Sequence, residues 1–203
     1  MQIKLHQGDL PGDEKFGDSV AIDTEAMGLN PHRDRLCLVQ LCGADQVCHL
    51  VQFAEGEFAA PNLVNLLRDK KITKIFHFAR FDLAMLKHYL GVTVEPVYCT
   101  KIASRLARTF TDRHGLKDLT RELLGVEMSK IEQSSDWGAA KLSEPQLKYA
   151  ASDVIHLHQI AARLDAMLKR EGRQDLAAAC FAFLPSRVDL DLNGWAETDI
   201  FAH

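Results

Sequence analysis

Four acidic side chains and one tyrosine are the residues of this chain whose types and spacing best suit chemistry. Asp23 and Glu25 end an apolar run in VAIDTEAMGL, Asp82 lies in FHFARFDLAML, and Tyr149 precedes Asp153 by four residues in YAASDVIHL. Because side chains alternate between the faces of a strand, Asp23 and Glu25 should project from the same side. Residues spaced i, i+4 share one face of a helix, so Tyr149 and Asp153 should do the same.

A group of carboxylates like this one predicts a metal site. Acids gathered on one surface repel one another and resist desolvation unless cations lie between them. Ligand sets made only of oxygen suit Mg²⁺ or Mn²⁺, and two such ions about 3.5–4 Å apart form a centre that cleaves phosphodiesters. We therefore expect a site for two divalent cations, Mg²⁺ or Mn²⁺, held by Asp23, Glu25, Asp82 and Asp153.

Each of these motifs is ordinary when it is taken alone. A DxE pair often only solubilises a strand edge, and a YxxxD pair often joins a core tyrosine to an exposed aspartate. Asp82 alone could be the N-cap or a first-turn acid of its helix, where the helix dipole favours negative charge. The combination of strand acids, a helix-start acid and a helix acid with its tyrosine is far more specific.

The composition describes an ordinary globular chain. Its 203 residues favour one domain over 1–203, and 47% of them are hydrophobic and 26% charged. No apolar run could span a bilayer, and the N-terminus lacks the pattern of a signal peptide, so we expect no membrane association. Five cysteines without a CxxC pair argue against a disulfide framework or a thiolate zinc site and favour the reducing cytoplasm. The net charge of −4 argues against tight binding of long nucleic acid.

The order of the predicted elements indicates an α/β domain, with a mixed central sheet flanked by helices. Strands are predicted at 3–6, 19–23, 36–41, 47–51 and 72–77, the first four as antiparallel neighbours. Helices are predicted at 61–67, 82–89, 100–110, 116–124, 143–169 and 173–183. Ser143 and Gln146 form a capping box for the long helix. The tail, about 185–203, is predicted to be less regular and to dock on its own domain or on a neighbouring copy.

The motifs together resemble the DEDD superfamily of 3′–5′ exonucleases, in its tyrosine-bearing (DEDDy) branch typified by ribonuclease D. The three motifs of the family are matched by Asp23 with Glu25, by Asp82, and by Tyr149 with Asp153. The SerSerAspTrp stretch at 134–137 and the following LSEPQLKYAASD also resemble the approach to the third motif. The histidine-bearing branch would place its histidine where this chain has Lys148. The resemblance covers about residues 9–168 and implies a ribonuclease H-like fold.

A narrower resemblance is to the nanoRNase C group of short α-proteobacterial enzymes, through the blocks LNPHRDRLCLVQL, ITKIFHFARFDLA, PVYCTKIASRLARTFTDRHGLKDL and GWAETDIFAH. It implies hydrolysis of very short RNA oligonucleotides, especially dinucleotides such as pGpG, to nucleoside 5′-monophosphates, and a ring-shaped homo-octamer. Two alternatives stay open. One is a broader 3′–5′ exonuclease for longer RNA or DNA, and the other is a catalytically silent scaffold that binds nucleic acid. A generic metal-dependent phosphatase would not predict the tyrosine.

The resemblance also implies roles for the individual residues. Asp23 would bridge the two ions, as the first aspartate of the family does. Tyr149 would orient the attacking water, because a phenol with an ordinary pKa of about 10 is a poor base at neutral pH. Leu29 matches the apolar wedge that the family presses against the 3′ bases, although Met27 and Leu29 could equally anchor their loop.

The remaining candidate contacts with substrate each have a second interpretation. His77 could contact sugar or phosphate or be a core histidine, and Phe81 could stack on a base or be core. A basic stripe is predicted to grip a terminal 5′ phosphate or to form a solvated or subunit-facing surface. Its residues are Lys101, Arg105 and Arg108 on one helix and Arg113, His114 and Lys117 at the next helix start.

Overall fold

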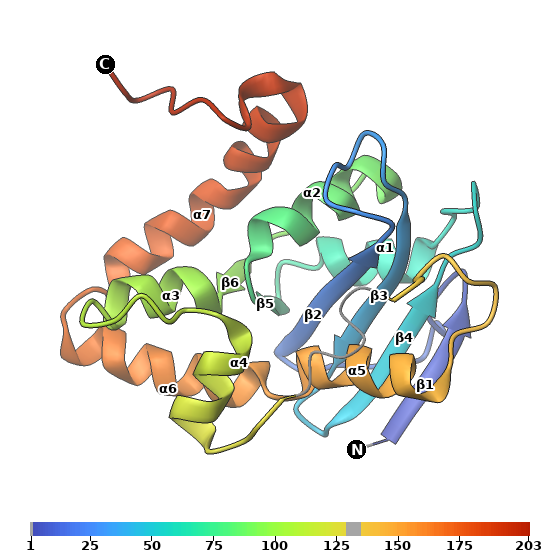
Figure 1. Cartoon of the computed structure of the whole chain (residues 1–203), viewed down its shortest axis with the longest axis horizontal. Coiled ribbons are helices and arrows are strands. Elements are labelled where there is room, and N and C mark those ends of the chain that lie inside the picture. The colour runs from blue at the N-terminus through green and yellow to red at the C-terminus, as the bar shows by residue number, and fades with distance from the viewer. Residues whose placement is uncertain (1, 129–134) are drawn as a thin grey trace.

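A six-stranded mixed sheet, in the order β1-β4-β3-β2-β5-β6, forms the centre of the molecule (Figure 1). The computed structural model describes residues 2–128 and 135–203. The central strands β2, β3 and β4 are antiparallel, whereas β1, β5 and β6 pair in parallel with their neighbours. The strands are β1 (Gln2–Gln7), β2 (Ser19–Ala26), β3 (Leu36–Cys42), β4 (Val47–Gln52), β5 (Thr73–Phe76) and β6 (Val97–Cys99).

Two features of this sheet differ from the sequence-based prediction. β1 lies beside β4 and runs parallel to it, so it is not an antiparallel neighbour of β2. Residues 8–18 carry the chain from this edge to the middle of the sheet, a path that strand spacing alone does not reveal. β6 was not predicted, because three residues are too few to show the alternating pattern of a strand.

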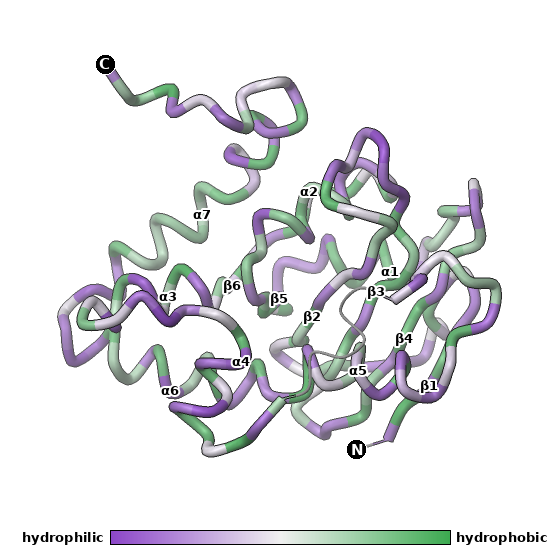
Figure 2. The backbone as a smooth tube through the Cα atoms, viewed as in Figure 1, coloured by the Kyte–Doolittle hydropathy of each residue, from purple (hydrophilic) through white to green (hydrophobic). Residues whose placement is uncertain are grey.

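Helices cover both faces of the sheet and continue beyond its β6 edge (Figure 1). α1 and α2 pack on one face and α5 on the other, while α3, α6 and α7 pack against one another. Figure 2 shows hydrophobic stretches along α7 and a mainly hydrophilic tip on the loop between β2 and β3. The bounds are α1 (Pro61–Arg68), α2 (Ala79–Leu90), α3 (Thr100–Ala107), α4 (Leu116–Leu119), η1 (Thr120–Leu124), α5 (Glu144–Ile155), α6 (Leu157–Arg170), α7 (Gln174–Leu190) and η2 (Asp191–Trp195).

The alternation of β2 decides which face receives its acids. Val20 and Ile22 are buried in the core that β2 shares with α1 and α2. Ala21 is buried on the opposite face, in the core that includes Ala151 of α5. Asp23 and Glu25 follow Ala21 at intervals of two, so they lie on the face that α5 covers.

The long helix predicted over 143–169 is in fact two helices. The capping box at Ser143 is confirmed, because its backbone N–H donates to Gln146 Oε1 over 2.9 Å and its hydroxyl accepts from the Gln146 N–H over 3.4 Å. The helix breaks at His156, where no glycine or proline marks a stop. The halves share one core where they meet, at Val154 and Leu157, but α5 also buries Ala150 against the sheet and α6 buries Leu164 against α3 and α7. Packing therefore decides this break.

The C-terminal helix extends further than the sequence indicated. Pro185 lies inside α7 rather than at the start of a tail, because Leu184 and Val188 are both buried and hold the helix on each side of it. Arg80 of α2 then pairs with Asp191 over 2.5 Å and donates to the Ala196 carbonyl over 2.8 Å, which docks η2 on the domain. Residues 197–203 are exposed. Within the described residues, no helix has the length and hydrophobicity that crossing a membrane requires.

Candidate active site

Three carboxylates converge where β2 ends beneath α5. Asp23 and Glu25 come from β2 and Asp153 from the last turns of α5, and one oxygen of each lies within 4.8 Å of the others. The three side chains are half-buried. β2 presents its two acids to α5 because they are two residues apart, and the packing of Ala151 and Val154 on the sheet turns Asp153 toward them. Residues distant in the sequence thus form one oxygen-rich site.

Asp82 lies beside this cluster rather than within it. It is in the first turn of α2, is 2% exposed, and accepts a hydrogen bond from the Thr24 hydroxyl over 2.7 Å. Thr24 points to the α2 face of β2, opposite to Asp23 and Glu25, so Asp82 approaches from the other side of the strand. Its negative charge still reaches the cluster, since it raises the pKa of Asp23 and of Glu25.

Crowding and burial make the carboxylates resist ionisation. Burial, and then the charges of Asp82, Asp153 and Glu25, raise the pKa of Asp23 well above its ordinary value. Burial, and then the charges of Asp153 and Asp82, raise the pKa of Glu25 to about 9. Burial raises the pKa of Asp82 and of Asp153 to about 7. None of these shifts is opposed by a lysine or arginine in the described part of the chain.

The donor set fits hard divalent cations. Carboxylate oxygens are the ligands that Mg²⁺ and Mn²⁺ prefer, and positive charge is what four crowded acids without basic partners require. Asp23, Glu25 and Asp153 offer oxygens close enough to share an ion, and Asp82 offers another at the side. The site can therefore take up divalent cations, in exchange for protons, at the point where β2 meets α5.

Tyr149 is placed to donate a hydrogen bond in this site. Burial, and then the charges of Asp153, Glu25 and Asp23, raise its pKa above the ordinary value, so the phenol stays protonated. A hydrogen bond from Tyr149 lowers the pKa of Asp153 against the larger effect of burial. The ring of Trp137 lies 6.0 Å from the ring of Tyr149, centroid to centroid, and buttresses it. Ser134, part of the stretch that resembles the family, lies outside the described residues.

Two supporting side chains escaped the sequence analysis. Thr24 holds Asp82, as described above. Gln40 lies directly across from Asp23 in the β2–β3 ladder, is fully buried, and donates from Nε2 to Glu25 Oε1 over 3.5 Å. The Oε1 atom of Gln40 is buried and has no protein partner in the described structure. Only the pairing of the strands could have identified Gln40, because nothing in its sequence context distinguishes it.

The residues predicted to contact substrate differ in how far they are exposed. Met27 and Leu29 are 51% and 83% exposed on the loop after β2, and Leu29 shares a surface hollow with half-buried Phe81. His77 directly follows β5, and its Nδ1 lies 2.9 Å from the Thr100 hydroxyl. That hydroxyl donates to the Phe76 carbonyl, so it accepts from Nδ1–H of His77 and leaves Nε2 as an acceptor. Burial and nearby Lys101 lower the pKa of His77 to about 3.

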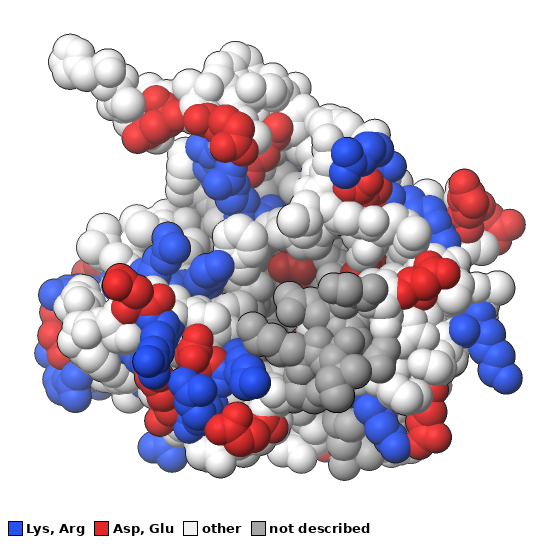
Figure 3. Space-filling model, viewed as in Figure 1, with Lys and Arg blue, Asp and Glu red and all other residues white. Residues whose placement is uncertain are grey.

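The basic stripe is only partly available, and its Arg108 is a correction to the prediction. Arg108 is 1% exposed, pairs with Glu122, and donates to the Arg113 carbonyl over 2.9 Å, so it closes the α3–α4 turn instead of facing solvent. His114 is half-buried, with Nδ1 2.8 Å from the Ser104 hydroxyl. Arg105 and Arg113 are exposed. Figure 3 shows basic side chains gathered over α3 and α4, to one side of acidic side chains near the centre of this face.

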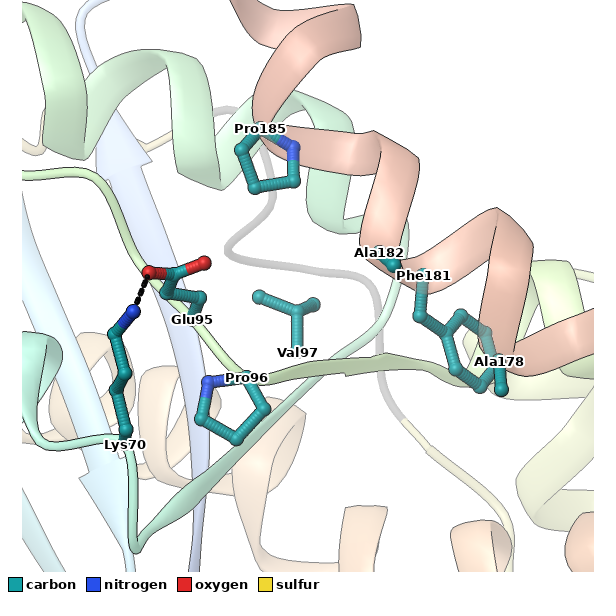
Figure 4. A pocket seen from close by; sticks show the side chains of 8 residues that line it. All are labelled: Lys70, Glu95, Pro96, Val97, Ala178, Phe181, Ala182 and Pro185. Atoms are coloured by element: carbon teal, nitrogen blue, oxygen red, sulfur yellow. Dashed lines mark ion pairs between the residues drawn. The ribbon is translucent and has the colours of Figure 1, made fainter.

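A hollow elsewhere on the surface lacks the groups for this chemistry. It measures about 480 Å³ and lies between β6 and α7, with Phe181 and Pro185 on its α7 side (Figure 4). The single carboxylate among its lining residues, Glu95, is paired with Lys70 over 2.7 Å. The acid cluster is therefore the better candidate for the reaction site.

Comparison with known proteins connects the acid cluster with one family. The sequence profile of the family described as 3′–5′ exonuclease matches residues 11–169, which include the four acids and Tyr149. A ribonuclease D of Gluconacetobacter diazotrophicus is 39% identical over 165 residues, which is 81% of this chain and 42% of that protein. The chain thus spans about two fifths of the length of the curated relatives it matches first.

Solved structures of Brucella melitensis NrnC, a nanoRNase C, are similar over the whole chain. The structure with bound Mg²⁺ has a TM-score of 0.96 and 57% sequence identity, and the match covers 100% of both chains. The structure bound to pGG has a TM-score of 0.97 and 58% identity, covering 100% of this chain and 99% of that one. The predicted ribonuclease H-like fold, with its mixed sheet flanked by helices, is confirmed by these matches.

Proposed function

Because the chain belongs to the 3′–5′ exonuclease family, we propose that it is a metal-dependent exoribonuclease for very short oligonucleotides. Dinucleotides such as pGpG are the preferred substrates in this proposal, and nucleoside 5′-monophosphates are the products. The convergence of Asp23, Glu25 and Asp153 beside Tyr149 is the observation that carries the proposal. The preference for short RNA is supported by the likeness to NrnC bound to pGG.

Different residues of the chain would have different roles in hydrolysis. Asp23, Glu25, Asp82 and Asp153 would hold Mg²⁺ or Mn²⁺, two ions in our proposal. When bound, such ions supply hydroxide near neutral pH and neutralise charge on the leaving 3′ oxygen. Tyr149 is kept protonated by its surroundings and donates its proton to Asp153, so its oxygen would accept a hydrogen bond from the attacking water and orient it.

The substrate contacts follow from exposure and charge. Leu29 and Met27 are exposed near the end of β2 and can press against bases at the 3′ end. His77 is neutral and offers Nε2 as an acceptor, which suits a sugar hydroxyl better than a phosphate. Arg105 and Arg113 remain the exposed cations proposed for a terminal phosphate, with His114 directly after Arg113 in the chain. Arg108 is not available for this contact, because its guanidinium is buried and paired with Glu122.

Length dependence tests the proposed preference. Purified protein in Mg²⁺ or Mn²⁺ should turn over 5′-labelled pGpG much faster than a 10-mer of the same base composition, and EDTA should stop both reactions. Equal rates on both lengths would favour the alternative of a broader exonuclease on RNA or DNA. No hydrolysis of any oligonucleotide with either ion would favour the silent nucleic-acid-binding scaffold.

Assembly and compartment belong to the same proposal. We propose a homo-octamer in which the exposed C-terminal residues contact a neighbouring copy, because Trp195 and Phe201 are 47% and 78% exposed. Truncation after Gly194, followed by mass measurement in solution, tests this; an unchanged mass would oppose an interface role. Five cysteines without a disulfide fit the reducing cytoplasm, which is the compartment we propose.

A further inference from the structure

The junction between β5 and α2 holds an exposed aromatic residue in an unusual conformation. Phe78 has φ 64° and ψ 44°, in the left-handed region, and its side chain is 46% exposed. A bulky residue adopts this conformation only at a cost in free energy, and glycine would adopt it without that cost. Burial does not explain the phenylalanine. Phe78 directly follows His77 and lies four residues before Asp82, so it is close to the acid cluster along the chain.

Phe78 forms a wall shared by two surface hollows. The first measures about 480 Å³ and is also lined by Leu29, Phe81 and Ala84. The second measures about 370 Å³ and is also lined by Lys101. The Nζ atom of Lys101 lies 4.0 Å from the centroid of the Phe78 ring. Because Lys101 lines only the second hollow, the ring can present its other face to the first.

The first hollow has a preorganised back wall. Asp191 and Leu192 of η2 line it, and the Arg80–Asp191 ion pair holds η2 against α2. On the opposite side, Leu29 is 83% exposed, so an apolar side chain faces solvent with no protein group covering it. The hollow thus combines an aromatic ring and an aliphatic side chain, which is an arrangement that suits a flat, apolar-faced group such as a nucleobase.

We propose that Phe78 determines substrate affinity by stacking on a base of the dinucleotide, which lies between Phe78 and Leu29. This inference rests on the proposed function and adds a residue to it. Lys101 covers the far face of the ring, and no carboxylate in the described part of the chain acts on its ammonium group. Phe78 touches the substrate without taking part in bond cleavage, so its effect should appear in KM rather than in kcat.

A cycle of protein and substrate changes tests the stacking. pGpG is compared with two analogues, each lacking one of its guanines, in the wild-type protein and in Phe78→Ala. We expect Phe78→Ala to raise KM for pGpG by about tenfold or more with kcat little changed. For the analogue that lacks the stacked guanine, the substitution should change KM by less than about twofold. Phe78→Tyr should retain near-native KM.

Two controls separate stacking from structure. Phe183→Ala removes another half-exposed phenylalanine, which lines the second hollow but not the first, and should leave the KM for pGpG near native. Phe78→Gly should raise KM as Phe78→Ala does while keeping or raising the melting temperature, because glycine relieves the left-handed strain. Equal losses on pGpG and on both analogues would overturn the stacking role.

Different experimental results would contradict this inference and the proposed function. If the wild-type protein hydrolysed no dinucleotide, the proposed function would fail, and the binding of pGpG in Ca²⁺, measured by calorimetry, would still report on Phe78. Wild-type hydrolysis of pGpG together with a native KM in Phe78→Ala would overturn the inference alone.

Discussion

The hydroxyl of Thr24 donates a 2.7 Å hydrogen bond to Asp82 Oδ1 and so links the middle of β2 to the first turn of α2. Asp82 is nearly inaccessible to water, and this bond lowers its pKa against the larger, opposite effect of burial. The two acids that flank Thr24 point to the other face of β2. A single strand therefore positions acids on both of its faces.

Thr24→Val should weaken both stability and metal binding. It removes the side-chain donor of buried Asp82 and leaves only the backbone N–H donors of Thr24 and Asp82; a hydrogen bond to a charged partner contributes about 1.5–3 kcal/mol of unfolding free energy. We expect the Mg²⁺ dissociation constant to rise by about 10–100-fold, as it does for other changes behind metal ligands. Denaturant unfolding and calorimetric Mg²⁺ titration measure the two effects. Thr24→Ser keeps the hydroxyl and serves as the control; a native Mg²⁺ affinity in Thr24→Val would contradict the expectation.

Tyr149→Phe should slow pGpG hydrolysis by about 10²-fold while leaving Mg²⁺ affinity nearly unchanged. The phenol orients the water rather than binding the ions, so its loss should affect the chemical step. Single-turnover rates and Mg²⁺ titrations check the two halves of this expectation. Tyr98→Phe is a matched control, because the Tyr98 hydroxyl donates to the Ala161 carbonyl over 3.3 Å. Normal turnover in Tyr149→Phe would remove the tyrosine from the mechanism.

The stability of the metal-free protein should fall as pH rises from about 5 to 9. Burial and like charge raise the pKa of Glu25 to about 9, and burial raises the pKa of Asp82 and Asp153 to about 7. In the unfolded chain these groups titrate near pH 4. Between those values the folded state holds protons that the unfolded state has released, so raising the pH favours unfolding.

Saturating Mg²⁺ should reverse this dependence, because the cation binds deprotonated carboxylates and thereby stabilises the folded state more at higher pH. Melting temperatures measured across this pH range, in EDTA and in Mg²⁺, give both slopes. Asp23→Asn removes one of the repelling charges, so in EDTA its slope should be shallower while its hydrolysis is lost. A slope in EDTA that is flat or rising in the wild-type protein would show that the carboxylates ionise normally.

Gln40→Leu should reduce Mg²⁺ affinity with little loss of folding. The side chain of Gln40 is fully buried beside Glu25 and orients it, and leucine has a similar volume. We expect the Mg²⁺ dissociation constant to rise by about tenfold. Gln52→Leu tests the specificity of this effect, because buried Gln52 donates to the Ala139 carbonyl over 2.9 Å. If both variants bound Mg²⁺ equally, the orienting role of Gln40 would be wrong.

Local patterns predicted the parts of this fold that depend on near neighbours in the chain. The four strands of the first third, the capping box at Ser143 and the shared faces of Asp23 with Glu25 all follow from short-range periodicity. The break at His156 could not be predicted in this way. The same apolar period continues through it, and two helices are required only because Ala150 of α5 packs on the sheet whereas Leu164 of α6 packs against α3 and α7.

Of the sequence patterns, charge spacing on helices was the least informative about which side chains are exposed. Lys101, Arg105 and Arg108 are spaced to form one stripe, yet the chain turns back after α3 and buries Arg108 against Glu122. Phe78 could not be identified as a site residue from the sequence, because its backbone conformation and the surface hollow that it lines, rather than its residue type, distinguish it.

The amino-acid sequence by itself determined the acids, the tyrosine and the faces of the strand and helix that carry them, because these depend on periods of a few residues. Only the tertiary structure decided that Asp153 meets Asp23 and Glu25, while Asp82 comes from the opposite face of β2 and Gln40 and Thr24 support the site. The physical reason is that such contacts join segments up to about 130 residues apart, which come together only when the sheet and α5 bury their apolar faces against each other.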